Sequence, residues 1–286
     1  MKPEILMPAG RLAYRNKQAS VLSHTVLDLA HSAEHGPGQL VARPGAGGER
    51  HGSFFSSGTS NATAMATRTA AQLYDMLDQL VDETNSEQAW DGYAAVMLKA
   101  LLVHGAAWNE GRSTLRKALE SPSAGDTVPA WRRSSFREFA PRLLGYGAVD
   151  AERLSDCTDQ RVTLVGYGSF DGEGGRLYRL PLPPSLSGKQ GWRRLTITLA
   201  WLTPINPNHR AYRRGVLSFT PITGSLQLRH PDVVECREDA GGLKGATVPY
   251  GIAVSLEVET ELAIPLYEEM QERIRPQVQV ITAIRA

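Results

Sequence analysis

Ser60 is the residue whose type and setting point most directly to chemistry. It follows Gly58 and Thr59 and stands where a long helical pattern begins. The unpaired N–H groups and the positive dipole end of a helix stabilise negative charge nearby. A serine there has backbone donors close to any oxyanion that forms on an attacked carbonyl. This setting suits a serine nucleophile for acyl transfer, and it equally suits an ordinary capping serine, which is a common helix start.

The helix that would carry Ser60 is predicted over residues 62–82. Its apolar residues recur every three or four positions, as expected of a helix with one buried face. They are Ala62, Ala66, Ala70, Leu73, Leu77 and Val81. Gly58, just ahead of this helix, is expected to permit a tight backbone approach that a larger residue would block.

A serine hydroxyl is a weak nucleophile unless a base lies in hydrogen-bond reach. We interpret the histidines before Ser60 as solvated or packed in loops, with His35 and His51 as first candidates if the chain supplies its own base. His104 ends an apolar run, and we expect it to cap a buried helix end, where a cation is favourable. The histidines that precede Ser60 are His24, His31, His35 and His51.

Four short segments together suggest a family. Residues 2–10 read KPEILMPAG, 58–62 read GTSNA, 93–102 read YAAVMLKALL and 144–150 read LGYGAVD. In this order they resemble four elements of the subtilisin-like serine proteases (subtilases, peptidase family S8). These elements are the segment before the nucleophile, the nucleophile turn, a late buried helix and the closing Gly-x-Gly-x-Val-Asp. The resemblance covers about residues 2–150, and covers them unevenly.

The chain also departs from this family. Subtilase nucleophile helices usually have a proline, a His or Leu, and a glycine where this chain has Ala64, Met65 and Arg68. Proline is tolerated early in a helix but is not required there, so Ala64 should cost little. Arg68 indicates that the close helix packing made by that glycine is absent or rearranged. The connection from Pro8 to Ser60 is also longer than expected, with extra residues rich in Gly, His and Ala.

The resemblance implies a serine-type endopeptidase that hydrolyses peptide bonds through an acyl-enzyme on Ser60. The backbone N–H of Ser60 would be one oxyanion donor, and Gly58, Thr59 and Ala62 complete the nucleophile motif. The family's Asp, His and oxyanion-hole Asn lie upstream of the element at residues 2–10, so we expect them outside this chain. The expected partners are a protein or peptide substrate and an N-terminal half that carries this Asp and His.

An alternative class is a non-catalytic binding or scaffold module derived from a truncated subtilase. Some bacterial subtilases act in phage defence, a role that the resemblance permits without supporting. No cofactor is expected, because calcium occurs in many subtilases but no Asp-rich loop argues for it here. Substrate preference, pathway and oligomeric state stay open.

Composition narrows the partners and the compartment. The formal net charge of +1 argues against an electrostatically driven nucleic-acid partner. Pairs of arginines at 132–133, 193–194 and 213–214 are interpreted as solvated surface. No apolar run approaches the length of a membrane span, so we expect no membrane partner. Two cysteines, Cys157 and Cys236, are too few for a disulfide framework and favour a cytoplasmic protein. Secretion stays open, because a signal peptide could lie on a missing upstream part.

The expected fold class is α/β followed by all-β. Residues 1–150 are predicted to be the C-terminal part of a subtilisin-like parallel-sheet domain, with further helices at 90–104 and 111–120. Residues 151–286 are predicted to form a β-sandwich with a short C-terminal helix and strand. Runs that alternate apolar and other residues with period two predict half-buried strands at 194–201 and 248–258, and 161–168 is a further strand candidate.

Overall fold

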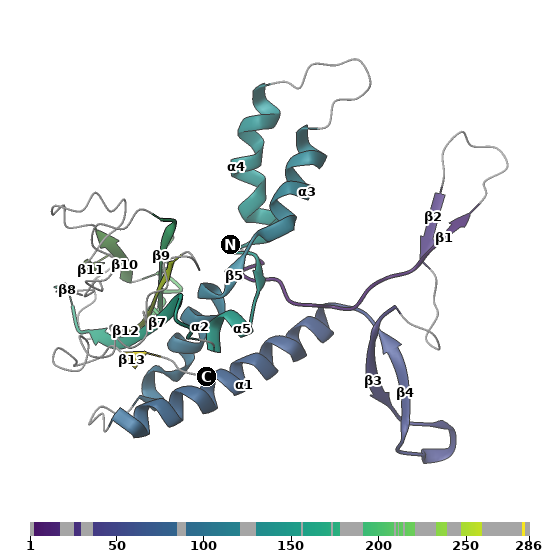
Figure 1. Ribbon diagram of the computed structural model, residues 1–286, viewed down its shortest axis with the longest axis horizontal. Helices are drawn as coiled ribbons and strands as arrows, with labels where there is room; N and C mark the ends of the chain where they lie inside the picture. Colours follow the sequence, from purple (N-terminus) through teal and green to yellow (C-terminus); the bar gives the residue numbers. More distant parts are fainter. Residues whose placement is uncertain are drawn as a thin grey trace. The chain divides into compact units, whose positions relative to one another are not determined.

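The chain is a mixed α/β protein with both helices and antiparallel sheets (Figure 1). No helix within the described ranges is long and apolar enough to cross a membrane. The computed structural model describes residues 3–17, 26–29, 37–84, 90–120, 130–155, 157–172, 174–177, 191–208, 210, 212–213, 215–220, 233–238, 247–258 and 282–283.

The chain divides into two compact units. The first contains residues 1–71 and 108–148, and the second contains residues 72–107 and 149–286. The long helix α1 (Thr59–Thr84) contributes its first part to one unit and its second part to the other. The expected domain boundary at residue 150 stays a prediction.

Two antiparallel hairpins occupy the long connection between Pro8 and Ser60 in the first unit. In the second hairpin Val41 lies opposite Phe54, and the guanidinium of Arg43 lies 5.6 Å from the centre of the Phe54 ring. These hairpins were not predicted from the sequence. The hairpins are formed by β1 (Tyr14–Lys17) with β2 (Val26–Leu29), and by β3 (Gln39–Arg43) with β4 (Gly52–Ser56).

The first unit also contains two neighbouring helices, α3 (Asn109–Glu120) and α4 (Ala130–Leu144), which lie side by side (Figure 1). The rings of Trp108 and Phe136 meet edge to face at 6.2 Å, and the guanidinium of Arg116 lies 5.3 Å from the centre of the Phe136 ring. The predicted helix at 111–120 is confirmed as α3. The helix α4 is not predicted from the sequence.

Two sheets form the second unit. The larger has the antiparallel order β13-β7-β12-β9, and the smaller has the antiparallel order β10-β11-β8 (Figure 1). The strands of the larger sheet are β7 (Arg161–Phe170), β9 (Arg193–Trp201), β12 (Val248–Val258) and β13 (Thr282–Ala283). Those of the smaller sheet are β8 (Gly174–Leu177), β10 (Gly215–Thr220) and β11 (Val233–Glu238). Short elements are β5 (Ala106–Ala107), β6 (Ala148–Val149), α5 (Glu152–Ser155) and the 3-10 turns Ala46–Gly48 and Asp91–Tyr93.

The central strand β12 is buried along both faces, which corrects the half-buried strand expected for residues 248–258. One face packs against helix α2 (Ala94–His104). A Cβ atom at Gly251 would lie 2.7 Å from Met97 Sδ, and Ala253 joins the cluster around Met97 and Leu101. The small and polar residues that suggested a solvent face are small because a helix approaches the sheet closely there.

The opposite face of the larger sheet has its own apolar cluster. Phe170 stacks on Tyr250 with ring centres 5.2 Å apart, and Leu217 of β10 packs against them together with Val248 and Ile252. Ile197, Leu199 and Trp201 of β9 flank this cluster. The alternation of large and small residues along β9 and β12 therefore separates a sheet-facing surface from a helix-facing surface.

The second part of α1 closes the core of the second unit with Leu73 and Leu77, which pack with Trp90 and Leu101. The buried indole of Trp90 donates a hydrogen bond from Nε1 to Asp78 Oδ1 at 3.0 Å. This bond gives Asp78, an otherwise exposed residue, a role in stability.

We expect Asp78→Ala to lower the free energy of unfolding by about 1–3 kcal/mol, because it leaves the buried Trp90 N–H without its acceptor. Urea unfolding followed by tryptophan fluorescence measures this loss. Asp75→Ala, one turn earlier on the same helix at an exposed position, is the control and should change stability by no more than about 0.5 kcal/mol. Equal losses in the two variants would contradict the prediction.

The long periodic elements predicted from the sequence are confirmed. The helices at 62–82 and 90–104 are α1 and α2, and the three strand candidates are β7, β9 and β12. The C-terminal helix expected around residues 266–274 and most of the last strand lie outside the described residues.

Candidate functional site

The turn that precedes α1 defines the position of Ser60. The carbonyl oxygen of Gly58 accepts the N–H of Asn61 at 3.0 Å and that of Ala62 at 3.4 Å. Gly58 is therefore the N-cap, and Ser60 is the second residue of the helix, which corrects the expectation that Ser60 itself caps it.

Gly58 is required for its backbone conformation. Its φ of 152° lies in a region that side-chain-bearing residues rarely adopt, but a Cβ atom added there would meet nothing within 4 Å. This corrects the expectation that Gly58 makes room for a tight approach. Gly58, Thr59 and Ser60 are exposed, and Ala62 is half-buried. The Ser60 hydroxyl is thus accessible on the first turn of a helix, where backbone N–H groups have no intrahelical acceptors.

The N-terminal segment supports this turn through backbone contacts. Gly58 N–H donates to the carbonyl of Ala9 at 2.8 Å, and Gln39 Nε2 donates to the carbonyl of Pro8 at 3.1 Å. The side chain of Asn61, next to Ser60, donates from Nδ2 to the carbonyl of Ser56 at 2.9 Å. Together these hydrogen bonds hold the backbone in place where it enters α1.

The segment at residues 144–150 lies against the same N-terminal segment. Tyr146 N–H donates to the carbonyl of Glu4, and Leu6 N–H donates to the carbonyl of Gly147, both at 2.7 Å. Leu6 and Ala148 form a parallel β-bridge. Within the first unit, the segment at 2–10 therefore contacts both the segment at 58–62 and residues 144–148, at different points along its length. The fourth, at 93–102, belongs to the second unit as part of α2.

Gly145 is the contact in this arrangement that tolerates substitution least. Its φ is 58°, and a Cβ atom would lie 2.3 Å from the carbonyl oxygen of Pro3 and 2.4 Å from that of Glu4. We expect Gly145→Ala to lose about 1–2 kcal/mol from the left-handed backbone alone, with a further loss from the clash. Gly47, with φ 79° and open space around it, is the control. Urea unfolding should show a greater loss for Gly145→Ala than for Gly47→Ala, and equal losses would contradict the packing argument.

The described part of the first unit supplies no base for Ser60. His51 is its one described histidine, and its exposed ring lies 3.9 Å from Glu49 Oε2. Within the described residues Ser60 makes no hydrogen bond to a histidine. His24, His31 and His35 lie outside the described residues.

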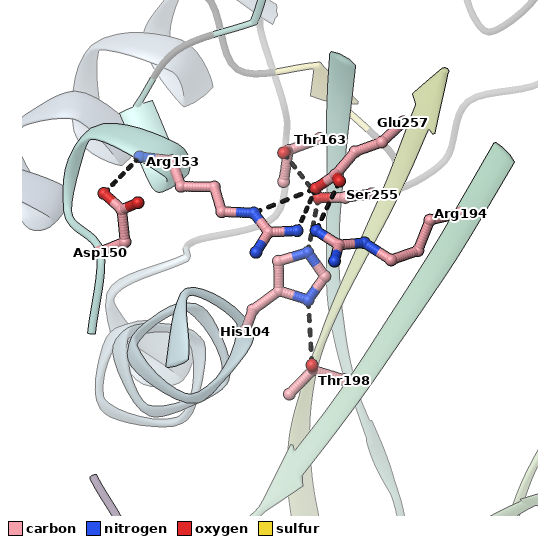
Figure 2. A network of polar contacts seen from close by, with 8 residues as sticks. All are labelled: His104, Asp150, Arg153, Thr163, Arg194, Thr198, Ser255 and Glu257. Carbon is pink, nitrogen blue, oxygen red and sulfur yellow. Dashed lines mark hydrogen bonds and ion pairs between the residues drawn. The ribbon is translucent and has the colours of Figure 1, made fainter. Parts of the chain in front are cut away.

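A buried polar cluster in the second unit was missed by the sequence analysis (Figure 2). His104, the last residue of α2, contacts Thr198 Oγ1 of β9 through Nδ1 at 2.9 Å and Ser255 Oγ of β12 through Nε2 at 2.6 Å. Ser255 Oγ lies 2.8 Å from Thr163 Oγ1 of β7. We call these four residues, with Arg153, Arg194 and Glu257, the His104 cluster.

Glu257 is the single carboxylate of this cluster and pairs with both guanidinium groups (Figure 2). Arg153 donates to Glu257 Oε1 from Nε at 3.0 Å and also from Nη2, and Arg194 Nη2 donates to Oε2 at 2.5 Å. Both charged partners come from elements far away in the sequence. No local motif could have predicted this arrangement.

Burial and, to a smaller extent, the nearby charge of Arg153 together lower the pKa of His104 from its ordinary value of 6.5 to about 4. The ring is therefore neutral at pH 7. The sequence predicts a cation at this helix end, where the helix dipole would stabilise it. That expectation is wrong, because the cost of desolvating the charged ring exceeds the dipole's contribution of at most about 2 kcal/mol.

Other candidate groups can be placed only in part. Arg194 is held by Glu257 and stacks over Trp192 with its guanidinium 5.5 Å from the ring centre, so it is not a free surface charge. Cys157 is half-buried and its Sγ accepts the backbone N–H of Thr163 at 3.4 Å, and the side chain of Cys236 lies outside the described residues. Among the side chains that the structure describes, no group of three or more His, Cys, Asp or Glu could hold a metal ion.

The most distinctive geometry for chemistry is therefore the exposed Ser60 on its supported helix start, and the most distinctive buried chemistry is the His104 cluster. Neither contains a complete set of nucleophile, base and oxyanion donors within the described residues. Comparisons of this chain with protein-family models, with curated proteins and with solved structures found no match.

Proposed function

We propose that this chain is the C-terminal part of a subtilisin-type serine endopeptidase, with Ser60 as the nucleophile that forms the acyl-enzyme. One observation carries the proposal. Within the first unit, the motif-bearing segment at residues 2–10 contacts two other motif-bearing segments that are far from it in the sequence, at 58–62 and at 144–148. Motifs that matched by chance would not require the first segment to contact the other two.

The proposed reaction assigns one role to Ser60 within this chain. Ser60 Oγ attacks the carbonyl carbon of a peptide bond, and a histidine from another polypeptide takes its proton. The backbone N–H of Ser60, on the first turn of α1, donates to the oxyanion. The C–N bond then breaks as the histidine returns the proton to the leaving amine. Water hydrolyses the resulting ester and restores the serine.

The remaining catalytic groups belong to a partner in this proposal. An N-terminal half would supply the base His, its orienting Asp and the second oxyanion donor. The short parallel pairing of Leu6 with Ala148 supports such a partner. Parallel strands occur almost only in sheets that are covered on both faces, and Ile5, Leu6 and Met7 are apolar residues that are only half-buried. Parallel strands from a partner would extend this isolated bridge into a sheet.

The finer fold assignment is part of the same proposal. Residues 1–150 would complete a subtilisin-like parallel-sheet domain, and residues 151–286 would form a β-sandwich. The packing of Leu217 in β10 against Tyr250 and Phe170 of the larger sheet supports two facing sheets. A cytoplasmic location is proposed on the basis of the sparse cysteines.

Labelling with a serine-directed fluorophosphonate tests the proposal. Three proteins are compared: this chain, this chain joined to an N-terminal half with the expected Asp and His, and the joined form with Ser60→Ala. We expect label on the joined wild type only. Ser57→Ala in the joined form is the control for disturbance of the turn and should keep its label. Absence of label on the joined wild type, or label that survives Ser60→Ala, would overturn the assignment.

A binding or scaffold module is the second candidate. It is favoured by the absence of a histidine at Ser60 within the described residues. In that case Ser60 would be dispensable, and the second unit would recruit a partner protein. Unchanged partner binding by a Ser60→Ala variant, together with a joined form that takes no label, would support this candidate.

A further inference from the structure

The His104 cluster fastens one end of a helix to three strands. His104 is the last residue of α2, and its ring contacts β9 through Thr198 and β12 through Ser255. Ser255 extends the chain of contacts to Thr163 on β7. His104, Ser255 and Thr163 are all buried, with 8%, 4% and 1% of their surface exposed. The hydrogen bonds that join this helix end to β9 and β12 therefore run through one titratable side chain.

Hydrogen bonding alone does not fix the charge of this ring. A neutral imidazole donates from one nitrogen and accepts at the other, and the hydroxyls of Thr198 and Ser255 can rotate to suit either tautomer. A protonated ring would donate from both nitrogens, which hydroxyl oxygens could also accept. Protonation of the ring must therefore be opposed by the surrounding charges and by the exclusion of water.

The charges around His104 are predominantly positive. Arg153 of α5 and Arg194 of β9 share the single carboxylate of Glu257 on β12. Arg161 of β7 lies opposite Glu257 in the strand register, and Asp150 accepts the backbone N–H of Arg153 at the exposed edge. Glu257 has 8% of its surface exposed, so solvent screens this group little. A proton on His104 would add a further positive charge to a buried site that already has more guanidinium than carboxylate groups.

We propose that His104 is an acid-sensitive latch: the neutral ring holds the end of α2 on β9 and β12, and uptake of a proton by the ring releases this helix end from the sheet. The latch is independent of any role for Ser60, because all of its residues lie in the second unit. It would make the second unit respond to acidification without a bound ligand.

The direction of the pH effect follows from the lowered pKa. Between pH 6.5 and about pH 4 the ring takes up a proton in the released state and not in the latched state. The latch is therefore complete above pH 6.5 and weakens as the pH falls through this window. Protonation of this one residue should lower the equilibrium constant for latching about twenty-fold between pH 7 and pH 5.

Hydrogen exchange of the full chain tests the latch. The N–H of Gly105 donates to the carbonyl of Leu101 at 2.9 Å, so its exchange reports opening of the last turn of α2. After correction for intrinsic rates, we expect opening to increase about twenty-fold from pH 7 to pH 5. His104→Gln, which cannot take up a proton, should remove this increase. His51→Gln, at an exposed histidine, is the matched control and should keep it. The same increase in His104→Gln would overturn the proposal.

A second measurement needs no variant and covers the case in which His104→Gln does not fold. The imidazole signals of the wild-type chain are followed by NMR from pH 8 downward. We expect one histidine to stay neutral to about pH 5, in contrast to exposed histidines, which titrate near pH 6.5. Titration of every histidine near pH 6.5 would overturn the latch.

Discussion

Alanine in place of Ser60 is expected to stop the peptide hydrolysis that we propose for this chain joined to an N-terminal half. The fall in kcat/KM should be at least about 10⁴-fold, because alanine has no oxygen to be acylated and the remaining groups cannot replace the covalent step. The variant should fold normally, since Ser60 is exposed and alanine is a good helix former. The free energy of unfolding should change by less than about 0.5 kcal/mol.

The control for this result is Ser57→Ala. Ser57 lies three residues before Ser60, outside α1, and is half-buried. Its loss should leave kcat/KM within a few-fold of the wild type. Cleavage of an unstructured protein substrate, followed with both variants at equal concentration, compares them directly. Full activity in Ser60→Ala would exclude Ser60 as the nucleophile and favour the binding-module alternative.

Removing the charge of Glu257 should cause the largest loss of stability among the variants considered. Glu257→Gln leaves Arg153 and Arg194 without their shared carboxylate, and these two side chains are 21% and 41% exposed. Breaking a fully buried ion pair by removing one partner costs about 3–5 kcal/mol, so we expect a loss at the lower end of this range, because solvent partly screens the remaining charges. The similar size of glutamine separates this electrostatic loss from a loss of packing. Urea unfolding at pH 7 measures it.

An exposed ion pair of the same chain provides the matched control. Glu138 and Arg142 of α4 pair at 3.0 Å with more than half of each side chain exposed. Glu138→Gln should lose no more than about 1 kcal/mol, because solvent screens such pairs. If Glu257→Gln lost as little as Glu138→Gln, the His104 cluster would not be an electrostatic unit.

The sequence predicts the elements whose signals are local. The period of the apolar residues in α1, and the alternation in β9 and β12, identify these elements correctly. The same alternation wrongly predicts that one face of β12 is exposed to solvent, because Gly251, Ala253 and Ser255 are small or polar and alternate with large apolar residues. They are small because α2 packs against them, which is a tertiary fact. The helix α4 contains Pro141 and has no clear apolar stripe. Neither helix propensity nor the pattern of apolar residues therefore predicts this helix.

The candidate site shows the same limit. The position of Ser60 at a helix start follows from a glycine, small polar residues and the apolar pattern after them, all within a few positions. The surroundings of His104 depend on Thr198 and Ser255, which reach it from strands in the last third of the chain. An apolar run that ends in histidine gives no information on whether the ring is buried. Only the three-dimensional packing turns the expected cation into a neutral ring.

The bridge between Leu6 and Ala148 has a consequence for the order of events on the ribosome. It joins residues near the beginning of the chain to residues near its middle, and contacts of such long sequence separation form slowly because a large loop must close first. A nascent chain can form α1 soon after Thr84 emerges, but the segment that supports the Ser60 turn gains its second neighbour only after Ala148 has been made. Translation would therefore delay the contacts that support the turn around Ser60 until Ala148 has been made.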